Sequence, residues 1–230
     1  MPRWVKITLH FPSFFSYRIP DYSSQYALNV PLPSPSTVKL ALVATAIRTT
    51  GNVSEGKRVF YAIKDADIRI KPPKRIVVNS FLIKRLKRKK TPTELETFES
   101  TFGVREYVFF SDNVDVFIGC DNMDAILKYL KMLRYLGTGD SIVYVMSVSE
   151  TENPPENAVK AVTGKEFANT VSSTEHVIVY PVKDLSKNAK IEQINPHSTK
   201  SSKNVFERKY YLIRAKMRKG RNWKLFDMQF

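Results

Sequence analysis

Residues 3–11 have the sequence RWVKITLHF, in which polar and apolar side chains alternate. Val5, Ile7, Leu9 and Phe11 share one face, and the residues between them share the other. A period of two residues predicts a strand with one buried face. By the same criteria we expect further strands at residues 66–71, 75–86, 104–110, 114–120 and 141–148.

Helix signals lie between these strands. The segment 38–50 is apolar on almost all sides, follows a Ser-Pro-Ser-Thr run at 34–37 and stops at Gly51, which is ordinary helix capping. We also expect helices at 54–64 and 124–136. The resulting order is strand, helix, strand, strand, helix, strand. This order predicts an α+β fold of the ferredoxin-like or RRM-like class.

The sequence predicts two parts. Residues 1–150 would form the ferredoxin-like domain, and residues 151–230 a small β-rich C-terminal extension. The acidic, proline-containing stretch at 151–156 is the expected boundary. Strands of the extension are expected at residues 176–182, 205–214 and 223–228.

The chain is strongly basic: 37 Lys and Arg oppose 22 Asp and Glu, giving a net charge of +15. Such a protein repels itself unless it meets an acidic partner, and the usual partner is a phosphate backbone.

No apolar stretch approaches the ~20 residues of a membrane-spanning helix, so no membrane association is expected. Cys120 is the only cysteine, which excludes an intramolecular disulfide. No secretory signal pattern is present, and we expect a cytoplasmic protein.

Six of the seven residues from 84 to 90 are cationic, namely Lys84, Arg85, Lys87, Arg88, Lys89 and Lys90. The predicted strands on either side would carry this run outward as a protruding hairpin. Mutual repulsion among six charges disfavours that arrangement unless an anion lies against it, which favours contact with nucleic acid. The alternative is a plain solvated hairpin tip.

A second basic cluster covers residues 208–224, with eight cations and no acid. Tyr210, Tyr211 and Trp223 lie among these cations. Rings on which bases stack, beside cations that hold phosphates, suit single-stranded nucleic acid. The same pattern fits a strand whose alternate residues, such as Tyr211 and Ile213, belong to the core, and the sequence leaves both interpretations open.

The irregular stretch at 12–33 is long for a connection inside a compact domain, which is typical of a functional loop. Its candidate contacts are Tyr17, Arg18, Tyr22 and Gln25. The loop leads to the helix start at 34–37, where free backbone N–H groups and the helix dipole favour an anion. Capping by the hydroxyls of Ser36 and Thr37 competes for the same donors.

Signals for catalysis are weak. His10, His176 and His197 are far apart in the sequence, and neither a metal-binding cluster nor a phosphate-binding P-loop is present. We therefore expect no catalytic residue, no metal and no cofactor. One alternative is a metal-independent endoribonuclease that uses His10 or His176 beside a Lys and a Tyr. Another is an RNA-protein scaffold of the ribosomal or RNase P kind.

The stretches FSYRIP (15–20), QY (25–26) and PLPSPSTVKLA (31–41) are more specific. Together they resemble the start of the Cas5 family, subunits of CRISPR Cascade complexes within the RAMP superfamily. The form YRIPDY at 17–22 is most similar to archaeal type I-A members. The resemblance is strongest near the N-terminus, and the order of elements supports it to about residue 150.

This resemblance implies a non-catalytic role in antiviral defence, in which the subunit holds the 5′ handle of the CRISPR RNA (crRNA) and caps the backbone filament. The implied partners are the crRNA and the backbone (Cas7-type), large (Cas8-type) and small subunits, and contact with target DNA stays open. It also implies an RRM-like fold with a hairpin "thumb", here at 81–105. The type I-C branch cleaves precursor RNA with a Tyr, Lys and His group, but no Lys-His pair follows the second strand here.

The expected RNA contacts come from four segments: the loop, the helix start, the thumb and a sparse glycine-rich loop. They are Tyr17, Arg18, Tyr22, Gln25, Ser34, Ser36, Thr37, Lys39, Lys84, Arg85, Lys87, Arg88, Lys89, Lys90, Arg105, Gly137 and Gly139.

Replacing Lys87, Arg88, Lys89 and Lys90 together with Ser should weaken RNA binding and leave the melting temperature nearly unchanged. The reason is that cations on a hairpin tip hold phosphate and support no core. Filter binding and thermal denaturation measure the two effects. A large loss of stability with intact RNA binding would show that the run is structural.

Overall fold

The computed structural model describes residues 2–22, 26–91, 97–170, 177–194 and 204–229. The described helices are α1 (Pro35–Thr50), α2 (Val53–Ile63), α3 (Asp124–Leu130), α4 (Gly164–Thr170) and α5 (Ile191–Ile194). The strands are β1 (Arg3–His10), β2 (Tyr26–Ala27), β3 (Asp67–Lys71), β4 (Arg75–Arg88), β5 (Phe98–Phe110), β6 (Val114–Cys120), β7 (Tyr144–Thr151), β8 (Val159–Val162), β9 (Val177–Leu185), β10 (Phe206–Lys219) and β11 (Trp223–Met228). The predicted α+β class is confirmed.

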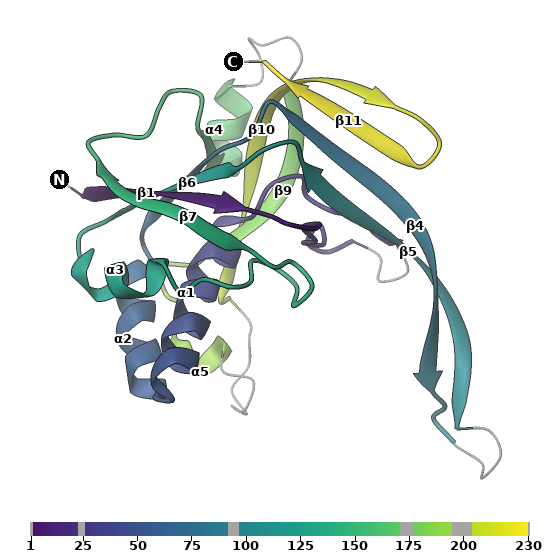
Figure 1. Cartoon of the computed structure of the whole chain (residues 1–230), viewed down its shortest axis with the longest axis horizontal. Coiled ribbons are helices and arrows are strands. Elements are labelled where there is room, and N and C mark those ends of the chain that lie inside the picture. Colours follow the sequence, from purple (N-terminus) through teal and green to yellow (C-terminus); the bar gives the residue numbers. More distant parts are fainter. Residues whose placement is uncertain (1, 23–25, 92–96, 171–176, 195–203, 230) are drawn as a thin grey trace.

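The strands join in one 11-stranded sheet with the order β2-β5-β4-β11-β10-β8-β3-β6-β1-β7, and β9 also pairs with β10. In Figure 1 the hairpin of β4 and β5 projects far from the rest of the molecule. Helices α1 and α2 lie together below β1 and β7 in the same view. The sheet therefore has a body, around β1, and a long arm.

Strand β1 lies inside the body, where it pairs antiparallel with β6 on one side and β7 on the other. Val5, Ile7 and Leu9 are at most 1% exposed, as their alternation predicts. Trp4, on the opposite face, is also buried, because its ring packs on Gly119, where a side chain would collide with it. The body is thus buried on part of its second face as well.

Helix α1 has the caps that the sequence predicts. The Ser34 side chain accepts a hydrogen bond from the backbone N–H of Thr37 at 3.2 Å. At the other end Gly51 adopts the left-handed conformation (φ 66°), and its N–H donates to the Ile47 carbonyl at 2.8 Å. No helix in the described part of the chain is long and apolar enough to cross a membrane.

Helix α3 is shorter than expected: it ends at Leu130, not at residue 136. Residues 134–136 leave the helix and pair with 141–143, since the Val143 N–H donates to the Arg134 carbonyl and the Leu136 N–H to the Ser141 carbonyl. Leu133 and Leu136 are still buried, so the apolar pattern was correct and its helical interpretation was wrong. Strand β7 accordingly starts at Tyr144, later than predicted.

The arm is a regular antiparallel hairpin whose register runs from Ile76 opposite Phe110 to Arg88 opposite Phe98. Both strands are longer than the expected 75–86 and 104–110, because pairing continues through the basic run. Strand β11 pairs with the base of β4 and joins the arm to β10.

The C-terminal strands are expected and present, and they pair with the body. Strand β8 pairs with β3 on one side and with β10 on the other, so the sheet continues across residue 151. The hydroxyl of Tyr211, which is fully buried on β10, donates to the Pro33 carbonyl just before α1 at 2.7 Å. The division into residues 1–150 and 151–230 stays a prediction.

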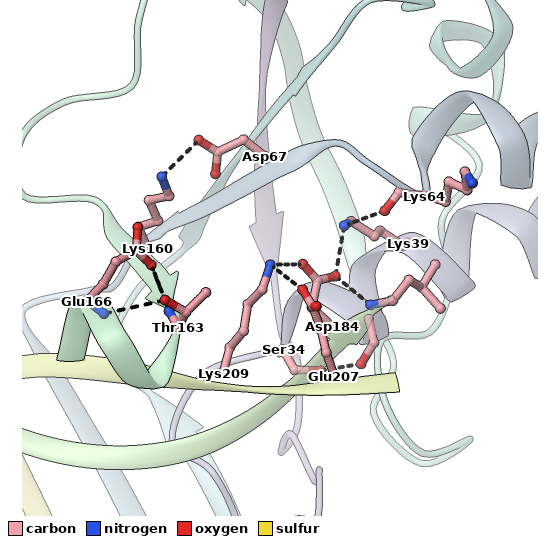
Figure 2. Close-up of polar contacts among 12 residues, drawn as sticks. Ser34, Lys39, Lys64, Asp67, Lys160, Thr163, Glu166, Asp184, Glu207 and Lys209 are labelled. Carbon is pink, nitrogen blue, oxygen red and sulfur yellow. Dashed lines mark hydrogen bonds and ion pairs between the residues drawn. The ribbon is translucent and has the colours of Figure 1, made fainter. Parts of the chain in front are cut away.

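A buried ion-pair network fastens α1 to β9 and β10 (Figure 2). The Lys39 ammonium, on a side chain 1% exposed, donates to Asp184 at 2.7 Å and to the Lys64 carbonyl at 2.8 Å. Lys209 donates to the other oxygen of Asp184 at 2.8 Å. Burial lowers the pKa of Lys39 from its ordinary value, and the charge of Asp184 opposes that shift.

Replacing Asp184 with Asn should lower the free energy of unfolding by about 3–5 kcal/mol, because Lys39 would keep its charge in a buried place without a counter-ion. Urea denaturation followed by circular dichroism measures this. The matched amide variant Glu150→Gln breaks an exposed pair with Arg3 and should cost much less. Equal losses in the two variants would contradict a special role for the buried network.

Candidate nucleic-acid interface

Two adjoining cavities meet at Tyr17. One, of about 380 Å³, is lined by the loop 17–21, the turn at 137–138 and Lys183. The other, of about 520 Å³, extends along α1 as far as Arg48. Tyr17, Gly137 and Lys183 line both cavities, so we treat them as one hollow and call it the Tyr17 pocket.

The Tyr17 pocket brings together six of the predicted RNA contacts from three distant segments of the chain. They are Tyr17, Arg18, Ser36, Thr37, Gly137 and Gly139.

The turn at 137–141 is fastened to the loop that carries Tyr17. The backbone N–H of Ser16 donates to the Ser141 hydroxyl at 2.9 Å, and the Thr138 N–H donates to the Ser16 carbonyl at 3.3 Å. Gly137 has a φ of 97°, and a Cβ there would lie 2.7 Å from that same carbonyl oxygen. Both the left-handed backbone and the close approach therefore require glycine.

The hydroxyls at the start of α1 are buried and bonded to one another. Ser34 Oγ lies 3.0 Å from Ser36 Oγ and 2.8 Å from Thr37 Oγ1. Ser34 is thus the helix cap. Of the two roles expected to compete at this helix start, capping and anion binding, the structure shows capping. Ser36 and Thr37 still line the pocket, and RNA contact by all three stays a prediction.

The charges at the Tyr17 pocket are mostly positive. Asp21 accepts hydrogen bonds from Arg208 at 2.6 Å and from Lys183 at 3.4 Å. The pKa of Asp21 is lowered mainly by the hydrogen bond from Arg208 and next by the charge of Lys183. Arg18 is exposed beside them, and the Arg48 guanidinium lies 5.3 Å from the centre of the Tyr135 ring. Cations beside aromatic rings can hold phosphates while a base stacks.

Sequence reasoning missed Lys183 and Arg48 as members of this site. Lys183 is a single cation in the β-prone stretch VIVYPVKDL, and Arg48 is a single cation near the end of an apolar helix. Neither belongs to a basic cluster, so only the tertiary fold reveals them.

The arm presents two different faces. Cross-strand pairing places Leu82, Lys84, Leu86 and Arg88 on one face with their partners on β5. That face carries four well-exposed apolar side chains, namely Leu82, Leu86, Phe98 and Phe102. The opposite face holds Lys87 across from Glu99, and Arg105 across from Phe81. The expected basic thumb is therefore also strongly apolar on one side.

Other predicted contacts lie elsewhere. Tyr22 is half exposed, and Lys90 is exposed just beyond β4. The ammonium of Lys39 is engaged by Asp184, so its contact with RNA stays a prediction without support from its position. Gln25 and the side chain of Arg85 lie outside the described residues, as do His176 and His197.

The core interpretation of the second basic cluster is confirmed for two residues, and contact of its exposed residues with nucleic acid stays a prediction. Tyr211 and Ile213 are fully buried, as the core interpretation expects. At the turn between β10 and β11, however, the side chains are exposed, including Lys216, Arg218, Lys219 and Arg221. Trp223 is 44% exposed among them.

His10 is exposed at the end of β1, and its Nδ1 lies 3.1 Å from the side-chain oxygen of Asn113. Within the described residues, no lysine or tyrosine forms a hydrogen bond with it. This arrangement offers no specific support for a histidine base.

Replacing Gly137 with Ala should lower the free energy of unfolding by about 1–3 kcal/mol and weaken RNA binding, because the turn must move away from Ser16. Gly139→Ala is the matched control for stability alone, since nothing lies within 4 Å of its added Cβ, while Gly139 itself is a predicted RNA contact. Thermal denaturation and fluorescence anisotropy with labelled RNA measure both variants. Unchanged stability in Gly137→Ala would contradict the close contact.

The chain was compared with family models, solved structures and curated sequences of known proteins. No protein-family model matches the chain. Among solved structures, a CRISPR protein from Archaeoglobus fulgidus aligns with 99% of this chain and 92% of its own, at 12% identity and a TM-score of 0.49. A chain of a CRISPR RNA-guided surveillance complex aligns with 90% of this chain and 88% of its own, at 14% identity and a TM-score of 0.44.

A sequence relative is far more similar than these structures. The CRISPR-associated protein Cas5 of Archaeoglobus fulgidus is 69% identical over 227 residues, which are 99% of this chain and 99% of the relative. Identity at this level over the whole length leaves one assignment: the chain belongs to the Cas5 family of CRISPR-associated proteins.

Proposed function

We propose that this protein is a non-catalytic subunit of a type I-A Cascade complex that binds the 5′ handle of the crRNA and caps the backbone filament. The observation that carries this proposal is the Tyr17 pocket, where six of the predicted RNA contacts meet. Membership of the Cas5 family adds to it.

The pocket can hold a single strand with little rearrangement of its side chains. Arg18, Lys183 and Arg208 offer charge-assisted hydrogen bonds to phosphate oxygens, which are roughly twice as strong as neutral ones. Asp21 holds Lys183 and Arg208 in position before RNA arrives, so less side-chain freedom is lost on binding. The Tyr17 ring is available as a stacking surface.

We also propose that the body is a ferredoxin-like, RRM-like domain. The antiparallel order β7-β1-β6-β3, with α1 and α2 before β3 and α3 before β7, supports this assignment. The arm, inserted between β3 and β6, is then the thumb. Its exposed apolar face is suited to a neighbouring subunit, and the backbone, large and small Cascade subunits are the proposed partners beside the crRNA.

Labelled repeat RNA, incubated with the purified protein in EDTA, tests the proposal on native and denaturing gels. We expect a retained and uncleaved RNA, with a preference for the handle sequence over unrelated single strands. Cleavage at one position that is lost in His10→Ala would replace the proposal with an endoribonuclease. Equal retention of unrelated structured RNAs would favour a general scaffold.

A further inference from the structure

A third and larger cavity, of about 1010 Å³, adjoins the Tyr17 pocket. It lies between the C-terminal half of α1, the segment that follows α3 and the start of β7. Arg48 and Tyr135 line both this cavity and the Tyr17 pocket, so the two meet at these side chains. We call it the Tyr144 groove, after its most exposed tyrosine.

The Tyr144 groove is lined by three cations, Arg48, Lys131 and Arg134, and by no carboxylate. All three side chains are exposed, and none forms an ion pair with another part of the chain that the structure describes. By contrast, Lys183 of the Tyr17 pocket shares Asp21 with Arg208. The groove therefore has an uncompensated positive charge, which favours an anionic occupant.

Aromatic side chains stand beside these cations. Tyr144 is 58% exposed and Tyr135 is 36% exposed, and the Arg48 guanidinium faces the Tyr135 ring at the junction of the two hollows. Exposed rings among unpaired cations are the composition of a surface for single strands, since bases stack on rings while phosphates meet the cations. An acidic peptide would satisfy the charges but would bring no bases to stack on the tyrosines.

The early end of α3 creates this arrangement. Residues 134–136 are held in an extended pairing with 141–143, in which Leu136 and Val143 point into the core. Tyr135 and Tyr144, each next to one of these buried residues, consequently point outward, and Arg134 is exposed beside them. A continuous helix to residue 136 would have wound these side chains around its axis instead of along one groove.

We propose that the Tyr144 groove is a second subsite for single-stranded RNA, which receives nucleotides adjoining those held in the Tyr17 pocket. This inference rests on the proposed function, because it extends the same strand along the same surface. Arg48 and Tyr135 form the passage between the two subsites, and Lys131, Arg134 and Tyr144 hold the continuation.

The test uses the full chain and fluorescein-labelled RNAs that begin with the handle sequence and are lengthened one nucleotide at a time at either end. Anisotropy gives the affinity for each length. The wild-type affinity should rise with length beyond the shortest RNA that binds. The variant Lys131→Ser/Arg134→Ser/Tyr144→Ala should bind that shortest RNA with unchanged affinity. For the longer RNAs it should lose about tenfold or more of the gain in affinity, which is the effect of one stacked base.

The matched control Lys74→Ser/Lys165→Ser/Tyr61→Ala also removes two exposed positive charges and one exposed tyrosine away from the groove, and it should keep the whole gain. A 4-thiouridine in the added nucleotides should cross-link the wild-type protein within residues 131–146, which decides the matter even if the triple variant folds poorly.

Two results would overturn the inference while leaving the proposed function intact. One is an unchanged gain with length in the groove variant, and the other is cross-links that fall outside the groove. A groove variant that keeps the gain but no longer assembles with its Cascade partners would assign the surface to protein docking instead. If even the shortest RNA fails to bind the wild-type protein, the proposed function fails, and the inference fails with it.

Discussion

The buried carboxylate of Asp184 is the contact on which the arrangement of this molecule depends. It joins Lys39 of α1 to Lys209 of β10. A shift of the helix along the sheet would therefore leave a charge in the interior without its partner. Because side chains alternate along β9, the strand that buries Asp184 also turns its neighbour Lys183 toward the Tyr17 pocket. One ion-pair network therefore sets both the packing of α1 and the position of a cation at the proposed binding surface.

The second constraint is the contact between Gly137 and the Ser16 carbonyl. It holds the glycine turn against the loop of Tyr17, and the start of α1 completes the same hollow. The three segments are far apart in sequence, so the pocket exists only when the body is folded. A site of this kind is preorganised, which reduces the conformational freedom lost when a flexible strand binds.

Local sequence was enough for the features that local forces decide. The alternation of Val5, Ile7 and Leu9 predicted a half-buried strand, and the residues around α1 predicted its two caps. The end of α3 could not be predicted, because Leu133 and Leu136 suit a helix equally well, and backbone pairing with 141–143 overrides that preference. The ion pair of Lys39 was missed for a related reason, since only the fold shows a carboxylate from residue 184 beside it. Lys183 was missed for the same reason, because its partner Asp21 lies on a distant loop.

The order of the sheet has a consequence for how the protein is made. The arm and the body are linked through β11, β10 and β8, and of the strands described here β10 and β11 leave the ribosome last. Until they emerge, one edge of β4 and one edge of β8 stay unpaired in the nascent chain, although both strands were translated earlier. Such long-range closure makes folding slow and leaves apolar edges unprotected in the meantime. The strands that join the arm to the body are therefore translated after both, and a ribosome stalled before residue 206 would display an unfinished sheet to the quality-control machinery of the cell.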